Sequence, residues 1–440
     1  MNLTLVSMTQ GGEAMGRDAT GRVVFVPYAI AGEEVVAEIV EEKKSYARAR
    51  LVEIVKPSPA RITPRCPHFA PPPSSPLPPS PSPVKTGEGE GGARGTRVGV
   101  GCGGCQWQHI AYDAQLKFKT EIVREQFARI GKFPDAPVRD TIGMSEPWDY
   151  RNNVQFHVAA NGDLCFRALE SHDLVHIREC YIQHPLVYEM FLSTELEGGE
   201  YSEVTLRTGT QTGQKMLILR GRDPQPPEIA VDEPVSIAYQ TPSGEIVSLI
   251  GRDAIHEELR GRAFRISPAS FFQVNTALAE KLVDLVEEYL APRPSDVLLD
   301  AYGGVGTFGL LLAPRVARVI EIEASASAIA DARANAVDVP NVEFQRGTVE
   351  EILPGLKAGV DIAVADPPRA GMDRRALDAL IALAPRAFAY VSCDPATLAR
   401  DARRLVDGGY RLVEAQPVDL FPQTYHIETV CRFERLTVLE

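Results

Sequence analysis

The sequence predicts a three-part protein whose last part is a doubly wound α/β domain. First, apolar strand-like runs alternate with helical patterns from residue 266 to the end of the 440-residue chain. Second, the stretch LLDAYGGVGTFGLLL at 298–312 reads as a strand, a Gly-rich turn and a helix start, the arrangement found in Rossmann-like domains. Third, residues 1–60 contain short β-rich runs with Gly-containing turns, which is typical of a small, OB-like β-barrel.

The barrel is expected from its three clearest strand-like runs, which lie at 22–26, 34–40 and 49–55. The same region carries a local basic cluster made of Lys43, Lys44, Tyr46, Arg48 and Arg50. This cluster fits either a nucleic-acid contact or a solvated strand edge.

The middle part, 61–265, is expected to be a mixed α+β domain. It combines a helical pattern at 112–130 with strand-like runs at 153–159, 202–208 and 215–220. Within it, the Pro-, Ser- and Gly-rich segment 71–99 lacks the apolar spacing of a folded core, so we expect a disordered insertion.

The last part, 266–440, provides the alternating elements of the α/β domain. A helix is expected at 277–290, because Leu278, Leu282, Leu285, Val286 and Tyr289 share one face. Strands are expected at 297–300, 316–323, 342–345, 361–366 and 387–392, and a further helix at 395–405.

Composition narrows the class of protein. The formal net charge of −13 argues mildly against a nucleic-acid partner, although local basic clusters matter more than the total. No secretion signal opens the chain and no apolar run is long enough for a membrane span, so we expect a cytoplasmic protein without a membrane partner. An odd count of seven cysteines then favours metal or catalytic roles over disulfides.

The Gly-rich turn and the strand ends indicate a cofactor site. Glu323 ends the strand that follows the turn, where an acid can accept hydrogen bonds from ribose hydroxyls, and the Tyr302 ring could flank the ligand. The alternative interpretation is that the Gly-rich segment is only a tight turn of the kind found in any α/β protein. Asp366 and Cys393 follow two further strands, and such ends line one crevice in an open sheet.

The surroundings of Cys393 predict opposing effects on its thiol. Asp394 and Pro395 suit the cap and first residue of a helix, and the helix dipole there favours a thiolate. The negative charge of Asp394, in contrast, disfavours the thiolate. An inert buried cysteine is the alternative for Cys393.

Four cysteines suggest a second site. In GCGGCQW, Cys102 and Cys105 have a spacing that suits zinc or an iron-sulfur cluster. Cys66 precedes the insertion and Cys180 follows it. Cys165 is the competing fourth ligand, and Cys431 reads as a core residue.

Five motifs together resemble the RNA uracil-5-methyltransferase family. They are FFQVN at 271–275, DAYGGVGTFGL at 300–310, DPPRAGMD at 366–373, YVSCDPATLARD at 390–401 and FPQTYHIETV at 421–430. The segment 11–27 resembles the TRAM domain, an RNA-binding barrel. The resemblance implies that Gln273, Tyr302, Glu323 and Asp366 contact S-adenosylmethionine, that Cys393 is the nucleophile and that Glu428 is the base. Many relatives carry a cysteine in the Gly-rich turn where this chain has Gly303.

The implied chemistry needs both a thiol and a carboxylate. Addition of a thiolate at carbon 6 of uracil makes carbon 5 nucleophilic enough to take a methyl group. A base such as Glu428 must then remove the proton from carbon 5.

The resemblance extends to a branch of the family with an iron-sulfur cluster. HIRECYIQHP around Cys180 matches that branch, so Cys66, Cys102, Cys105 and Cys180 are expected to hold a [4Fe-4S] cluster. The branch implies 23S ribosomal RNA as the substrate, with transfer RNA second, and no obligate protein partner is expected.

Two alternative functions fit the sequence less well. An amino-group methyltransferase would have no use for Cys393 or Glu428, and a non-catalytic RNA-binding iron-sulfur protein would not need the intact motifs.

Overall fold

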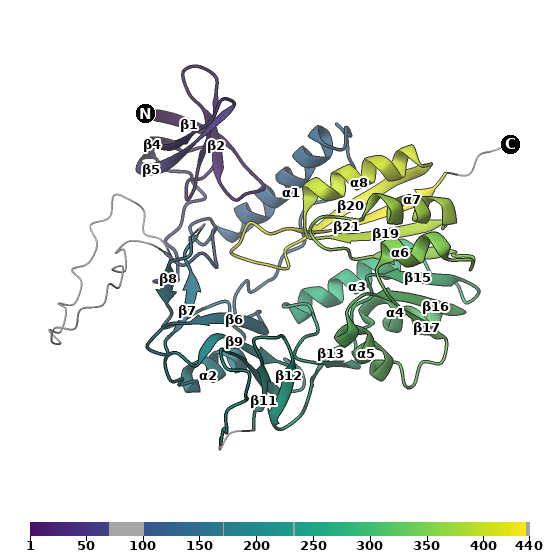
Figure 1. Ribbon diagram of the computed structural model, residues 1–440. Coiled ribbons are helices and arrows are strands. Elements are labelled where there is room, and N and C mark those ends of the chain that lie inside the picture. Colours follow the sequence, from purple (N-terminus) through teal and green to yellow (C-terminus); the bar gives the residue numbers. More distant parts are fainter. Residues whose placement is uncertain (70–100, 170, 232–233, 437–440) are drawn as a thin grey trace. The chain divides into compact units, whose positions relative to one another are not determined.

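The computed structural model describes residues 1–69, 101–169, 171–231 and 234–436 (Figure 1). The predicted insertion at 71–99 lies outside these ranges. The chain forms two compact units. The first consists of Met1–Ala114, Cys165–Glu179 and Gln423–Tyr425, and the second consists of Gln115–Leu164, Cys180–Pro422 and His426–Glu440.

The first unit contains the predicted N-terminal barrel, which is closed with strand order β1-β2-β3-β5-β4. The strands are β1 (Asn2–Met8), β2 (Ala14–Arg17), β3 (Val23–Val26), β4 (Glu34–Glu42) and β5 (Tyr46–Lys56). Side chains alternate between covered and exposed positions along β1 and the first half of β5, so one face of each of these stretches fills the barrel. A short hairpin of β7 (Leu164–Arg167) and β8 (Leu174–His176) also lies mainly in this unit.

Acidic partners neutralise much of the basic cluster on the barrel. Arg50 pairs with Glu38, Lys43 with Glu41, and Arg48 with Glu13. The Arg50–Glu38 and Lys43–Glu41 pairs are exposed and worth little individually, whereas the Arg48–Glu13 pair is partly buried.

The second unit contains a mixed sheet in its middle region, with β12-β11-β10-β9-β6 in spatial order. Its elements are β6 (Asn153–Val158), α2 (Pro185–Ser193), β9 (Tyr201–Thr208), β10 (Lys215–Gly221), β11 (Ser236–Gln240) and β12 (Ile246–Ile250). The long helix α1 (Tyr112–Arg129) precedes them, and the hairpin β13 (Ile255–Leu259) and β14 (Arg262–Ile266) follows. The predicted α+β character is confirmed.

The C-terminal sheet has seven strands in the order β17-β16-β15-β18-β19-β21-β20. The strands are β15 (Val297–Ala301), β16 (Arg318–Glu323), β17 (Val342–Arg346), β18 (Ile362–Ala365), β19 (Ala387–Ser392), β20 (Tyr410–Val418) and β21 (Glu428–Arg435). The five strands from β17 to β19 are parallel, and β21 runs antiparallel to both of its neighbours. This confirms the predicted doubly wound α/β domain.

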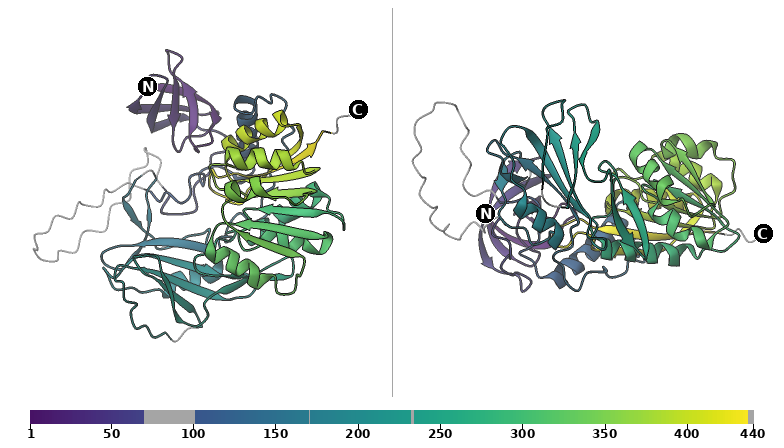
Figure 2. Two further views of the ribbon diagram at one scale, coloured as in Figure 1. Left: turned by 45° about the vertical axis from the view of Figure 1, so that its right-hand side comes forward. Right: turned by 90° about the horizontal axis from the view of Figure 1, so that it is seen from below.

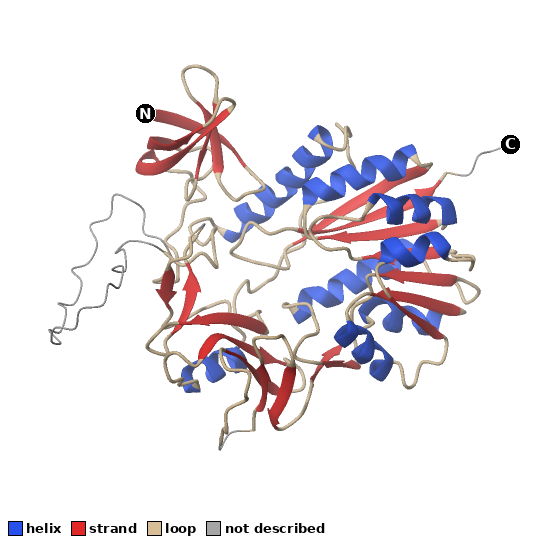
Figure 3. Cartoon of the chain, viewed as in Figure 1, coloured by secondary structure: helices blue, strands red, loops and turns tan. Residues whose placement is uncertain are grey.

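Helices cover both faces of this sheet (Figure 2, Figure 3). They are α3 (Thr276–Leu290), α4 (Thr307–Leu312), α5 (Ala326–Asn335), α6 (Val349–Ile352), α7 (Arg374–Leu383) and α8 (Pro395–Asp407). Helix α3 begins at Asn275, whose side chain accepts a hydrogen bond from the Leu278 amide, and it buries the predicted apolar face against β19 and β21. Over the described residues, no helix combines the length and apolarity that crossing a membrane requires.

Candidate active site

The site lies where the strand order of the C-terminal sheet reverses. β15 pairs with β16 on one side and with β18 on the other, so loops leaving their carboxyl ends diverge and leave a crevice. The Gly-rich turn follows β15 and takes up left-handed backbone at Tyr302 (φ 64°), Gly304 (φ 63°) and Gly306 (φ 90°). Glycine makes this conformation inexpensive, and it exposes the backbone of the turn to a ligand.

Glu323, at the end of β16, holds the turn in place. One carboxylate oxygen accepts a hydrogen bond from the Gly304 amide at 2.9 Å, and the other accepts one from the Ser325 amide at 2.6 Å. The hydroxyl of Tyr302 is buried without a hydrogen-bond partner among the described residues. A polar ligand at the turn would therefore find an unsatisfied donor there.

Gln273 and Asp366 meet at the carboxyl end of β18. The Gln273 side-chain amide donates to an Asp366 carboxylate oxygen at 3.4 Å, although the two residues are 93 positions apart. Burial raises the pKa of Asp366 to about 7. Its carboxyl is therefore poised between its two protonation states near neutral pH.

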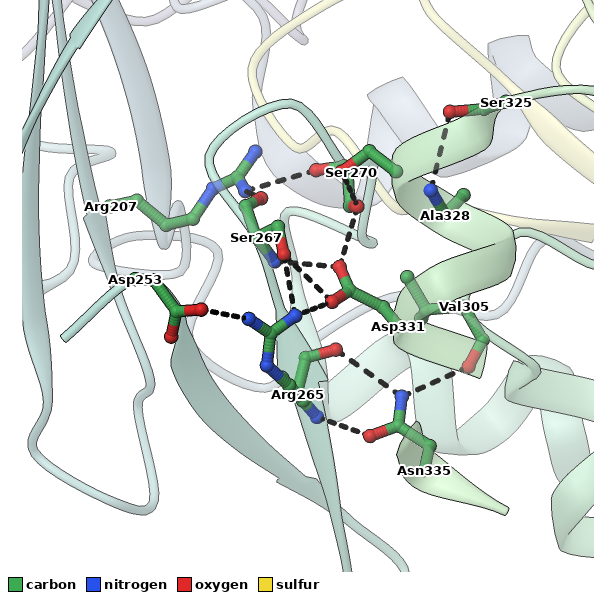
Figure 4. Close-up of polar contacts among 11 residues, drawn as sticks. Arg207, Asp253, Arg265, Ser267, Ser270, Val305, Ser325, Ala328, Asp331 and Asn335 are labelled. Carbon is green, nitrogen blue, oxygen red and sulfur yellow. Dashed lines mark hydrogen bonds and ion pairs between the residues drawn. The ribbon is translucent and has the colours of Figure 1, made fainter. Parts of the chain in front are cut away.

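Asp331 on α5 anchors the segment that carries Gln273 (Figure 4). Its buried carboxylate pairs with Arg265 and accepts hydrogen bonds from the Ser267 amide and the Ser270 hydroxyl at 2.7 and 2.6 Å. On the same helix, Asn335 donates to the carbonyls of Arg265 and of Val305 in the Gly-rich turn. Helix α5 thus ties the turn and the Gln273 segment to one rigid support.

Cys393 follows β19 directly and is half-buried. As predicted, Asp394 caps α8, because its carboxylate accepts hydrogen bonds from the amides of Ala396 and Thr397. Burial, together with the carboxylates of Glu428 and Asp366, raises the pKa of the Cys393 thiol to about 11, and Arg369 opposes the shift. Desolvation by burial is the largest of these causes, so the site disfavours the thiolate form of Cys393.

Glu428 lies opposite Cys393 because of the β19–β21 register. Ser392 pairs with Thr429, so the residue after one lies beside the residue before the other. Glu428 is 4% exposed, so its carboxyl is buried beside the thiol. Burial and the nearby Asp366 raise its pKa well above the usual range, and Arg369 lowers it.

The site therefore gathers a thiol, two carboxyls of raised pKa and one cation. It can perform nucleophilic addition and general acid–base chemistry beside a turn suited to a nucleotide-like cofactor. Arg369 comes from the predicted DPPRAGMD motif but had no predicted role. His426 was also missed; it contacts Phe421 edge-on at 5.7 Å between ring centroids, and burial lowers its pKa to about 4.

Comparison with known proteins identifies the family. Residues 244–436 match the family model described as tRNA (Uracil-5-)-methyltransferase, and residues 5–52 match the TRAM domain. An uncharacterized RNA methyltransferase of Gloeobacter violaceus is 34% identical over 473 residues, covering 99% of this chain and 96% of the relative. The chain belongs to the RNA uracil-5-methyltransferase family.

Other relatives agree with this membership. An uncharacterized RNA methyltransferase of Caldanaerobacter subterraneus is 34% identical and covers 98% of this chain and 97% of its own length. The crystal structure of Pyrococcus abyssi tRNA (uracil-54, C5)-methyltransferase in complex with S-adenosyl-L-homocysteine is similar, with a TM-score of 0.74 and 26% identity. That comparison covers 98% of this chain and 100% of the other. The protein is thus an enzyme of a family that uses S-adenosylmethionine.

The cysteines predicted to bind a cluster in this methyltransferase lie in both units. In the first unit, the Cys66 sulfur lies 3.7 Å from His68 Nδ1, and the Cys102 amide donates to the His68 carbonyl at 2.7 Å. Cys105 belongs to the same unit, whereas Cys180 belongs to the second. Over the described residues, no group of three or more His, Cys, Asp or Glu side chains is arranged to hold a metal ion. Cys431 is fully buried on β21, as predicted.

Sequence reasoning also missed an ion pair that supports the methyltransferase site. Lys119 on α1 and Asp419, just after β20, are fully buried and joined by a hydrogen bond. Lys119 also donates to the Phe421 carbonyl at 3.3 Å, within the segment that leads to Glu428. No local pattern could reveal a pair that is 300 residues apart.

Proposed function

We propose that this enzyme methylates carbon 5 of a uridine in 23S ribosomal RNA, with Cys393 as nucleophile and Glu428 as base. The observation that carries the proposal is the register of β19 and β21, which sets a thiol and a buried carboxyl side by side next to Asp366. An amino-group methyltransferase would need neither the thiol nor Glu428.

Cys393 would act first. Because the raised pKa disfavours the thiolate, the thiol proton must pass to solvent before or during attack. The sulfur then adds to carbon 6, which makes carbon 5 an enolate-type nucleophile. S-adenosylmethionine supplies the methyl group as a sulfonium.

Glu428 would act last. After carbon 5 has taken the methyl group, Glu428 removes the proton from that carbon, and the bond between carbon 6 and the Cys393 sulfur breaks. Its burial suits this task, because a carboxylate of raised pKa is a stronger base than a solvated one.

The remaining predicted residues would bind the cofactor. Glu323, at the end of β16 and bonded to the Gly304 amide, would accept hydrogen bonds from the ribose hydroxyls, and Tyr302 in the turn would flank the ligand. Gln273 and Asp366, which contact each other, would face the methionine part. Because target carbons 5 and 6 are closed to attack inside a stacked helix, the uridine must lie in a loop or be flipped out.

The proposed function predicts methyl transfer to one class of RNA. Purified enzyme is incubated with labelled S-adenosylmethionine and with 23S ribosomal RNA or bulk transfer RNA from cells lacking the enzyme, and the RNA is digested to nucleosides. We expect labelled 5-methyluridine from the ribosomal RNA. Label only in transfer RNA would support the alternative substrate, for which the Pyrococcus abyssi neighbour is named. Label on an exocyclic nitrogen would refute the proposed chemistry.

We also propose that Cys66, Cys102, Cys105 and Cys180 bind a [4Fe-4S] cluster. The support is the spacing of GCGGCQW, the resemblance around Cys180, and the contacts through His68 that bring Cys66 and Cys102 together across the insertion.

Anaerobic purification tests the cluster. We expect the wild-type protein to be brown. The visible absorbance of the cluster should be lost in the Cys102→Ser and Cys180→Ser variants. Cys165→Ser is the matched control and should keep its colour, because this buried cysteine lies outside the proposed ligand set. A colourless wild-type protein with stoichiometric zinc would refute the iron-sulfur assignment.

A further inference from the structure

A buried carboxyl beneath the Gly-rich turn has no part in the proposed mechanism. Glu321 on β16 is fully buried, and neither of its carboxyl oxygens has a hydrogen-bond partner among the described residues. Asp300 on β15 is also fully buried; its Oδ2 accepts a hydrogen bond from the Gly309 amide at 2.7 Å, whereas its Oδ1 has no such partner. Two unsatisfied buried acids are costly unless they hold protons or meet a positive charge.

The two side chains lie directly against the turn. A Cβ at Gly303 would approach the Glu321 Cγ to 2.4 Å, so the turn has no room for a side chain here while Glu321 keeps its position. A Cβ at Gly309 would lie 2.9 Å from an Asp300 oxygen and 3.4 Å from a Glu321 oxygen. The two carboxyls therefore converge under the backbone that is proposed to hold the cofactor.

The charged groups around this pair are acidic. Glu323 lies two residues further along β16. The charge of Asp366, at the end of β18, raises the pKa of Asp300. Tyr302 is the titratable side chain that the turn contributes, and α4 carries no titratable side chain. Burial, followed by the charges of Asp300 and Glu323, raises the pKa of Glu321 well above its usual range. Burial raises the pKa of Asp300 to about 7. Two ionised carboxyls that converge in a buried site repel each other, so the pair favours retaining a proton.

The two cofactor forms differ in charge. S-adenosylmethionine carries a positive sulfur, which becomes neutral once the methyl group has left. A positive charge brought into a buried acidic site favours the ionised form of nearby carboxyls, whereas a neutral sulfur does not.

We propose that the Asp300–Glu321 pair makes the cofactor site specific for charge: it releases a proton to solvent when S-adenosylmethionine binds and regains one when the sulfur becomes neutral. The inference rests on the proposed binding of the cofactor at the Gly-rich turn. Its consequence is that the enzyme favours the methyl donor over S-adenosylhomocysteine and lets the product go. By linkage, each proton released on binding strengthens affinity by up to tenfold per pH unit.

Titration calorimetry with the full chain tests the proposal. Both ligands are titrated near pH 7 in two buffers of different ionisation enthalpy, which counts the protons released. We expect more protons, by up to one, for S-adenosylmethionine than for S-adenosylhomocysteine. The ratio of the two affinities should rise with pH by up to tenfold per unit. Glu321→Gln should remove most of this difference, and Glu343→Gln, an exposed acid on the neighbouring strand, should keep it.

Equal proton counts for the two ligands in the wild-type protein would overturn the proposal, and this comparison holds even if Glu321→Gln does not fold. An unchanged difference in a folded Glu321→Gln protein would also overturn it. Failure of both ligands to bind would refute the cofactor site itself, and the proposal with it. Binding of both without a proton difference would refute only the charge-specific pair.

Discussion

Replacing Cys393 with alanine is expected to abolish both methylation and covalent attachment of RNA. Without the sulfur, carbon 6 of the uracil has no nucleophile, and carbon 5 stays too unreactive to take a methyl group. The measurement is transfer of labelled methyl to RNA, together with a denaturing gel that detects protein bound covalently to RNA.

Replacing Glu428 with glutamine should give the opposite pattern on the gel. Addition and methyl transfer need no base at carbon 5, so this variant should methylate once and then stall as a methylated protein–RNA adduct. Loss of a positioned general base slows a reaction by about a hundred- to ten-thousand-fold, which is enough to make the adduct persist. The readout is a shifted band that carries the labelled methyl group.

A matched control comes from the same strand. Glu434 lies at the far end of β21, where it pairs with Arg411 and Arg432, and Glu434→Gln should turn over at close to the wild-type rate. Product formation by Cys393→Ala, or wild-type turnover by Glu428→Gln, would show that the assigned roles are wrong.

Replacing Lys119 with methionine is expected to destabilise the second unit by about 3–5 kcal/mol. The ammonium and Asp419 are both fully buried, so the substitution leaves a carboxylate without its counter-ion in the interior. Asp419 follows β20, which pairs with β21 at Glu428, so activity should fall as well. Urea unfolding followed by fluorescence measures the loss of stability.

Two further variants test whether the loss of stability comes from breaking the ion pair or from removing a lysine as such. Combining Lys119→Met with Asp419→Leu removes both charges, and should recover much of the lost stability. Lys281→Met on α3 removes an exposed ammonium and should change stability by less than about 0.5 kcal/mol. A loss below about 1 kcal/mol for Lys119→Met would contradict the proposed importance of the pair.

Some features of the fold and site followed from the sequence because they are local. The Gly-rich turn needs residues that tolerate left-handed backbone, and the glycines at 304 and 306 predict such a turn. The cap of α8 needs an acceptor followed by a proline, which Asp394 and Pro395 provide. The strands β15, β16 and β19 were visible as apolar runs because parallel strands are buried on both faces.

The first part of β16 shows the limit of such patterns. The apolar pattern predicted a strand from 316, but the strand begins at Arg318, because a 3-10 turn at Ala313–Arg315 uses the preceding residues. Strands β20 and β21 were not predicted, although β21 carries Glu428.

The sequence by itself thus determined the class of the C-terminal domain and the conformation of its Gly-rich turn, because backbone preferences and hydrophobic periodicity act over a few residues. Tertiary structure alone decided what these residues experience. The β19–β21 register brought Glu428 to Cys393, burial raised the pKa of both, and packing placed Glu321 beneath Gly303. Register and desolvation depend on segments that meet only in the folded chain, so no local pattern could have revealed them.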